Sequence, residues 1–109
     1  MAKADAADAD KPRKLAAGVA HSTLGYAYMK QDKTVAAIPE LRSASALLKG
    51  QDDQQYSVVL YRLGFAYAKL SKTTEAREVL TEAVKIQGPM QAMSQDLLAK
   101  VNAARAKGK

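Results

Sequence analysis

Residues 60–69 read Leu60-Tyr61-Arg62-Leu63-Gly64-Phe65-Ala66-Tyr67-Ala68-Lys69, and this stretch decides the fold. Its large and small residues fall at i, i+3, i+4 and i+7, which is one face of an α-helix: Leu60, Leu63, Gly64 and Tyr67. Gly64 is unfavourable there, because glycine in a helix interior costs about 1 kcal/mol relative to alanine. A helix that tolerates this cost usually needs a second backbone at close range. The stretch therefore predicts one helix of a tightly packed pair.

The partner helix is predicted directly after this stretch. Thr73 and Thr74 favour a helix start, and small or apolar residues then recur at i, i+4 and i+7, namely Ala76, Leu80 and Ala83. Two helices with small residues at facing positions form an αα-hairpin. We expect Gly64 to lie opposite Ala76 in this hairpin.

The same pattern occurs earlier in the chain. Residues 24–30 match residues 63–69 in the order leucine, glycine, aromatic, alanine, tyrosine and, at the end, lysine. Further matches follow in the next helix, where Ala37, Leu41 and Ala44 correspond to Ala76, Leu80 and Ala83. Every matched pair is offset by 64 − 25 = 39 residues. A helical hairpin that is repeated at such a period is typical of a helical solenoid.

The two units resemble the tetratricopeptide repeat (TPR), whose pattern is an aromatic residue, then L-G-x-x-Y, then A-x-x-x-F and a closing proline. The first unit departs from this pattern, because His21 replaces the large apolar residue and no proline closes the unit. The offset also exceeds the period of about 34 residues in that family. The structural repeat positions that the resemblance implies are Leu24, Gly25, Tyr28, Ala37, Leu41, Ala44, Leu60, Leu63, Gly64, Tyr67, Ala76, Leu80, Ala83 and Pro89.

The resemblance implies an all-α fold, a right-handed α-solenoid of two TPR-like helical hairpins with a capping helix. Within a single domain at residues 11–106, repeat one is expected at about 18–50, repeat two at about 57–89 and the capping helix at about 90–106. Residues 1–10 are expected to form a disordered lead-in, and residues 107–109 a basic tail.

Caps and breakers predict the helix boundaries. Asp10 is expected to cap the first helix, with Pro12 in its first turn. Its predicted core face consists of Leu15, Val19, Leu24 and Tyr28. The following helices are expected at about residues 34–49, 54–70 and 74–87, with Asp52 or Asp53 as the cap of the middle one. The capping helix carries an apolar stripe that should cover the last hairpin: Met90, Met93, Leu97, Val101 and Ala104.

Composition limits the classes of function. The chain has 109 residues, no cysteine and a formal net charge of +6. Disulfides and thiolate metal sites are therefore excluded. No apolar run approaches the roughly 20 residues of a membrane span, and residues 1–10 lack the apolar core of a signal peptide. The positive charge permits nucleic acid as a partner, although basic alanine-rich helical proteins are common.

Catalytic and cofactor chemistry is not indicated. His21 is the only histidine and falls at a position that should face the core, which favours a structural role. Asp52 and Asp53 are explained more simply as a helix start than as paired catalytic carboxylates. Gly25 and Gly64 each stand alone within helices, so no phosphate-binding loop is present. We expect a protein that is not an enzyme and that has no cofactor or metal.

The resemblance implies a binding groove along the first helix of each hairpin. The residues that would line it are Ser22, Tyr26, Met29, Lys30, Val58, Tyr61, Arg62, Phe65 and Lys69. One TPR subclass grips a partner's terminal carboxylate with lysine and asparagine in this groove. Ser22, Tyr26 and Arg62 stand at such positions here, so that clamp is not present. An alternative interpretation is that Tyr26 and Phe65 only pack against neighbouring helices.

The resemblance implies a protein–protein interaction module, a scaffold or adaptor. The apolar groove with Lys30, Arg62 and Lys69 near it suits an apolar or aromatic peptide of acidic character. Two alternatives remain open at this point. Homo-oligomeric assembly through the open end of the array is one, because such arrays generally need about three repeats for stability. The other is a basic helical nucleic-acid binder, whose affinity should collapse between low and moderate salt.

Overall fold

The computed structural model describes residues 2–107, with side chains for residues 10–104. The five helices of this part of the chain are α1 (Ala2–Lys30), α2 (Thr34–Leu48), α3 (Asp53–Lys69), α4 (Thr73–Ala83) and α5 (Pro89–Lys107). No strand occurs within these described residues. The predicted all-α class is confirmed.

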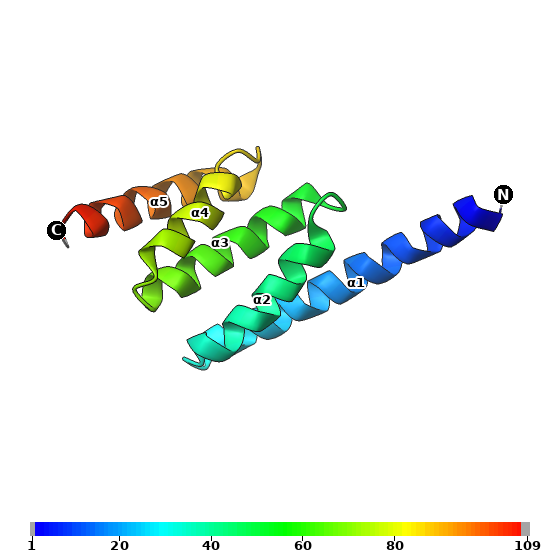
Figure 1. Cartoon of the computed structure of the whole chain (residues 1–109), viewed down its shortest axis with the longest axis horizontal. Coiled ribbons are helices and arrows are strands. Elements are labelled where there is room, and N and C mark those ends of the chain that lie inside the picture. The colour runs from blue at the N-terminus through cyan, green and yellow to red at the C-terminus, as the bar shows by residue number, and fades with distance from the viewer. Residues whose placement is uncertain (1, 108–109) are drawn as a thin grey trace.

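α3 is the central helix (Figure 1). Each helix packs against the next one in the chain, and α3 also contacts α1 and α5. Within the described residues, no Cα atom of α2 lies within 8 Å of a Cα atom of α4. The molecule measures 58 × 28 × 20 Å, and the N-terminal half of α1 projects beyond α2 (Figure 1). α3 thus lies between α1 and α5 and contacts both (Figure 1).

Two glycines bring the helices of each hairpin together. A Cβ atom on Gly25 would lie 2.7 Å from Leu41 Cγ, and a Cβ atom on Gly64 would lie 2.5 Å from Leu80 Cγ. Real Cβ atoms do not approach other atoms so closely. Only glycine fits at these positions without a shift of the neighbouring leucine, which confirms the close contact predicted from the repeat.

The partners of these glycines differ from the prediction. Leucines supply the nearest side-chain atoms, and of the two expected alanines only Ala37 supplies one of the nearest atoms, with its carbonyl oxygen 3.4 Å from the Cβ position on Gly25. The leucines lie one helical turn further along α2 and α4, and their branched ends fill the space that the missing Cβ leaves. The repeat did not predict a further close approach, between Gly18 and Leu48. A Cβ atom on Gly18 would lie 2.6 Å from Leu48 Cγ.

The turn within each hairpin repeats at the level of the backbone. Asp32 and Ser71, again 39 positions apart, both have positive φ values, of 64° and 61°. The amide after each of them donates to the carbonyl of a tyrosine at 2.8 Å, Lys33 to Tyr28 in one hairpin and Lys72 to Tyr67 in the other. This is the bond that satisfies orphan carbonyls at a helix C-terminus. The internal repeat therefore includes hydrogen bonding as well as residue type.

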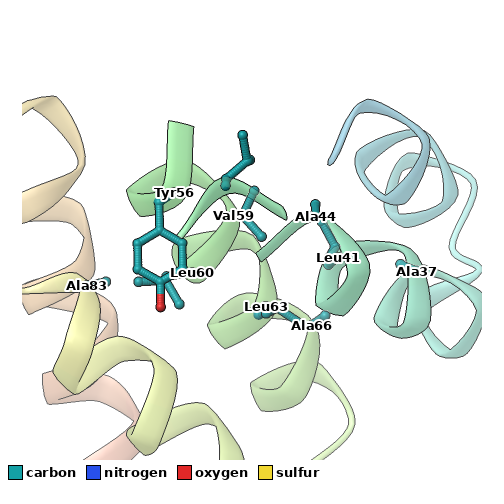
Figure 2. Packing of buried hydrophobic residues seen from close by; sticks show 10 residues of the cluster. Ala37, Leu41, Ala44, Tyr56, Val59, Leu60, Leu63, Ala66 and Ala83 are labelled. Carbon is teal, nitrogen blue, oxygen red and sulfur yellow. The ribbon is translucent and has the colours of Figure 1, made fainter. Parts of the chain in front are cut away.

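The core lies in two clusters. The first core contains ten buried residues from α2, α3 and α4: Ala37, Leu41, Ala44, Leu48, Tyr56, Val59, Leu60, Leu63, Ala66 and Ala83 (Figure 2). The second core contains Ala76, Leu80 and Val101, with Leu97 and Leu98 packed against it. Residues of α3 join both, because Tyr67 is partly buried against each cluster.

The predicted core face of α1 is half wrong. Leu15 and Tyr28 pack against the first core, but Val19 and Leu24 are 38% and 42% exposed. Among residues 10–30 of α1, the buried ones are Gly18, Ser22 and Gly25. α1 meets α2 through this narrow face of small residues, and within the described residues no helix lies against the opposite side of α1.

Two helix boundaries also differ from the prediction. α1 begins at Ala2 and contains Pro12, so the expected N-cap at Asp10 is wrong. The alanines of residues 2–9 are the strongest helix formers and extend the helix upstream. Residues 2–10 of the expected lead-in are helical, and Met1 and the last two tail residues lie outside the described residues.

α4 ends at Ala83 rather than near residue 87, because the chain tightens into a turn. The amides of Lys85 and Ile86 bond to carbonyls three residues back, at 3.1 Å each. At the start of α3, the Asp52 side chain accepts bonds from the amides of Gln54 and Gln55, as predicted for an N-cap.

Candidate functional site

A pocket of about 230 Å³ opens between α1 and α3. Its lining consists of Tyr26, Met29, Lys30, Tyr61, Arg62 and Phe65. All of these residues belong to the groove that the sequence predicts. The repeat explains their meeting, because Tyr26 and Phe65 occupy the same repeat position on two neighbouring helices.

The aromatic side chains of the pocket are accessible. Tyr26 and Phe65 are 43% and 44% exposed and belong to neither core. The rings of Tyr61 and Phe65, one turn apart on α3, lie 6.5 Å apart between centroids at an interplanar angle of 41°. Tyr61 is half-buried and also packs against the second core. Both Tyr26 and Phe65 are therefore partly open to solvent.

Two cations lie over the ring of Tyr26. The guanidinium carbon of Arg62 is 4.4 Å from the ring centroid. The ammonium nitrogen of Lys30 is 5.5 Å from the same centroid. Both distances fall within the range at which the ring quadrupole attracts a cation. Tyr26 thus brings one cation of α1 and one of α3 to the same place.

Arg62 is tied to α1 by hydrogen bonds to neutral groups. Its Nη1 donates to the hydroxyl of Ser22 at 2.8 Å and to the carbonyl oxygen of Ser22 at 3.2 Å. Partial burial lowers the pKa of Arg62, because desolvation penalises the charged form. Among the side chains that the structure describes, Arg62 pairs with no carboxylate. The pocket therefore holds a half-buried positive charge that is not neutralised from within.

Three predicted groove residues lie outside the pocket lining. Ser22 is 2% exposed and serves to hold Arg62. Val58 is half-buried on α3. Lys69 lies at the end of α3, where its Nζ donates to Asp32 at 2.6 Å, and this hydrogen bond lowers the pKa of Asp32. Lys69 lines a hollow beside the turn between α1 and α2 rather than the pocket.

A second concave surface lies where α2 and α4 diverge, and the sequence did not indicate it. Its volume is about 500 Å³, and its lining residues are Val35, Ile38, Pro39, Arg42, Tyr67, Leu70, Lys72, Glu75 and Glu78. Val35 is 71% exposed there, which is high for an apolar residue. The lining carries charges of both signs, so this surface favours neither anions nor cations.

Outside the pocket, a histidine and a glutamate link two helices. His21 is half-buried, and its Nδ1 lies 2.8 Å from Glu40 Oε1, so the pair bridges α1 and α2. No group of three or more histidine, cysteine or acidic side chains suited to a metal occurs in the described part of the chain. None of the described helices is both long and apolar enough to cross a bilayer.

Comparison with known proteins yields no match, whether to protein-family models, to curated proteins or to solved structures.

Proposed function

We propose that this chain is a non-catalytic protein-interaction module, a scaffold or adaptor that binds a peptide segment of a partner in the pocket between α1 and α3. In this proposal the five helices form a right-handed α-solenoid of two TPR-like hairpins, and α5 is the capping helix. The repeated glycine contacts and repeated turns support the two-hairpin architecture.

The observation that carries the proposal is the composition of the pocket. Exposed aromatic rings converge there with an arginine, and tyrosine and arginine are favoured anchor types of protein interfaces. Its volume of about 230 Å³ lies below the range of about 300–1,000 Å³ of small-molecule sites. A single bulky side chain of a partner segment suits this size better than a drug-sized ligand does.

Tyr61→Ala is expected to weaken binding of the partner segment by roughly thirtyfold, because truncation of a central interface aromatic costs about 2 kcal/mol or more. Isothermal titration of a partner obtained by affinity selection measures the loss. Met93→Ala is the matched control, because Met93 is 49% exposed on α5 and lies outside the pocket.

Tyr61 also packs against the second core, so thermal unfolding of each variant must accompany the titration. Tyr26→Ala supplies a test that does not depend on that packing, since Tyr26 is exposed. If both variants fold normally and bind with unchanged affinity, the pocket is not the binding surface.

A second candidate function, self-association through α1, rests on a separate observation. Leu24 is 42% exposed, whereas Leu63 at the same repeat position is 3% exposed in the first core. Covering Leu24 and Val19 with a second copy would remove two exposed apolar side chains from water. In this case sedimentation should show a dimer whose population rises with concentration, and Leu24→Glu should abolish it. A wild-type chain that sediments as a monomer at all concentrations contradicts this candidate.

A further inference from the structure

We infer that Arg62 and Lys30 form an anion receptor positioned by Tyr26, and that the partner segment carries an aspartate or glutamate next to the apolar side chain that enters the pocket. This inference rests on the proposed function, because it names the chemistry of the segment bound at that same site.

The first support is the fixed position of the guanidinium. Arg62 is held from one side by the hydroxyl and carbonyl of Ser22 and from another by the face of Tyr26. One nitrogen is engaged in these bonds, while the other guanidinium nitrogens make no hydrogen bond among the described residues. A cation whose orientation is already fixed loses little conformational entropy when an anion binds.

The second support is the charge balance around the pocket. No acidic residue lines it. Three acidic side chains have partners outside the pocket: Asp32 pairs with Lys69, Glu40 with His21, and Asp96 with Lys100. A partly desolvated arginine without a counterion gains from a carboxylate, since charge-assisted hydrogen bonds are the stronger ones. The neighbouring Lys30 adds to the positive potential.

The number of cations favours a carboxylate over a phosphate. Two positive groups, one of them already tied to Ser22, match a single carboxylate better than a phosphate with its greater charge and three acceptor oxygens. The rest of the lining is aromatic or thioether, which suits an apolar neighbour of the carboxylate. A polyphosphate chain would need a longer row of cations than this pocket provides.

In this proposal the aromatic residues of the pocket have two different roles. Tyr26 is a positioning residue, because its ring is engaged by the two cations. Tyr61 and Phe65 remain to contact the apolar side chain of the partner. Tyr26→Phe should therefore be tolerated, since phenylalanine also attracts cations, whereas Tyr26→Leu should not.

The test begins with selection of a random peptide library on the full chain. The peptides are displayed as N-terminal fusions, so that none has a free C-terminus. The tightest sequence is then synthesised with blocked ends, in one form with its acidic residue, in a second with the matching amide, and in a third with phosphoserine. Fluorescence polarisation measures the dissociation constant of each probe for each variant.

We expect selected peptides to carry aspartate or glutamate beside an aromatic or large aliphatic residue. Replacing the acid by the amide should weaken binding to the wild-type chain about tenfold. Arg62→Gln and Tyr26→Leu should cause a similar loss for the acidic probe and little change for the amide probe. Tyr26→Phe should leave the acidic probe unaffected. Lys69→Gln is the control, because Lys69 pairs with Asp32 outside the pocket.

Each contrary outcome separates the two proposals. Peptides that depend on Tyr61 but carry no acidic residue would overturn the anion receptor and leave the proposed function standing. Tighter binding of the phosphoserine probe than of the acidic probe would also overturn the inference, because the receptor would then be built for phosphate. Selection of no peptide whose binding depends on Tyr61 would overturn the proposed function itself.

Discussion

Gly64→Leu is expected to lower the midpoint of thermal unfolding by roughly 4–24 °C, because overpacking costs about 1–3 kcal/mol and a domain of this size loses about 4–8 °C per kcal/mol. Even the first atom of a side chain would lie 2.5 Å from Leu80 Cγ and Cδ2. Leu80 is fully buried in the second core, so a side chain at position 64 fits only if Leu80 moves within that core. α3 and α4 must separate to admit the leucine.

Gly64→Ala makes the same test sharper, because two effects of opposite sign compete. Alanine should stabilise the helix by about 1 kcal/mol relative to glycine. Contact with Leu80 should more than cancel this gain. Ala99→Leu is the control for added apolar bulk, since Ala99 is exposed on α5. A midpoint for Gly64→Ala at or above that of the wild-type chain would show that the helices are not in close contact there.

The hairpins could be predicted because their signal is local and repeated. A glycine inside a helix is costly, and finding one at the same place twice indicates that close packing compensates the cost. Gly18 escaped prediction because its counterpart in the second unit is Ser57, so the repeat does not mark it. Its contact with Leu48 depends on how far α2 extends beside α1, which is a property of the folded pair.

The candidate site could be predicted as a set of positions, but not as a network of charges. Helical geometry indicates which residues share a face, so the residues of the pocket lining were found from the sequence. It does not indicate which cation finds a partner. Lys69 forms an ion pair with Asp32, a turn residue with a positive φ, whereas Arg62 donates hydrogen bonds only to neutral acceptors. That difference depends on where α3 ends relative to the turn of the first hairpin.

The face of α5 that packs on α4 illustrates a limit of the apolar pattern. A stripe at i, i+4 and i+8, such as Met93, Leu97 and Val101, rotates by about 40° around the helix at each step. Its two ends therefore lie about 80° apart around the helix. The structure buries Ser94 and Val101 and partly buries two leucines between them, which gives the spacing i, i+3, i+4 and i+7. The stripe omitted Ser94 because serine is polar. It included Met93 and Ala104, which are exposed.

Val101→Asp is therefore expected to destabilise the chain by about 3 kcal/mol, the cost typical of an uncompensated buried charge. Val101 is 4% exposed in the second core, where it packs with Ala76 and Leu80. The new carboxylate would lie against apolar side chains of α4 unless α5 detached. Chemical denaturation followed by circular dichroism measures the loss, and exposure of the second core should appear as aggregation at high protein concentration.

Met93→Asp is the matched control, because the sequence stripe assigns Met93 and Val101 the same role and the structure does not. Met93 is 49% exposed, so an aspartate there stays in water and should change the free energy of unfolding by less than about 0.5 kcal/mol. Equal destabilisation by the two substitutions would indicate that Met93 and Val101 both face the core, as the stripe predicts. α5 would then have a different rotation about its axis. No destabilisation by either would show that α5 does not cover the second core, and Leu80 would then lie at an open surface of the last hairpin.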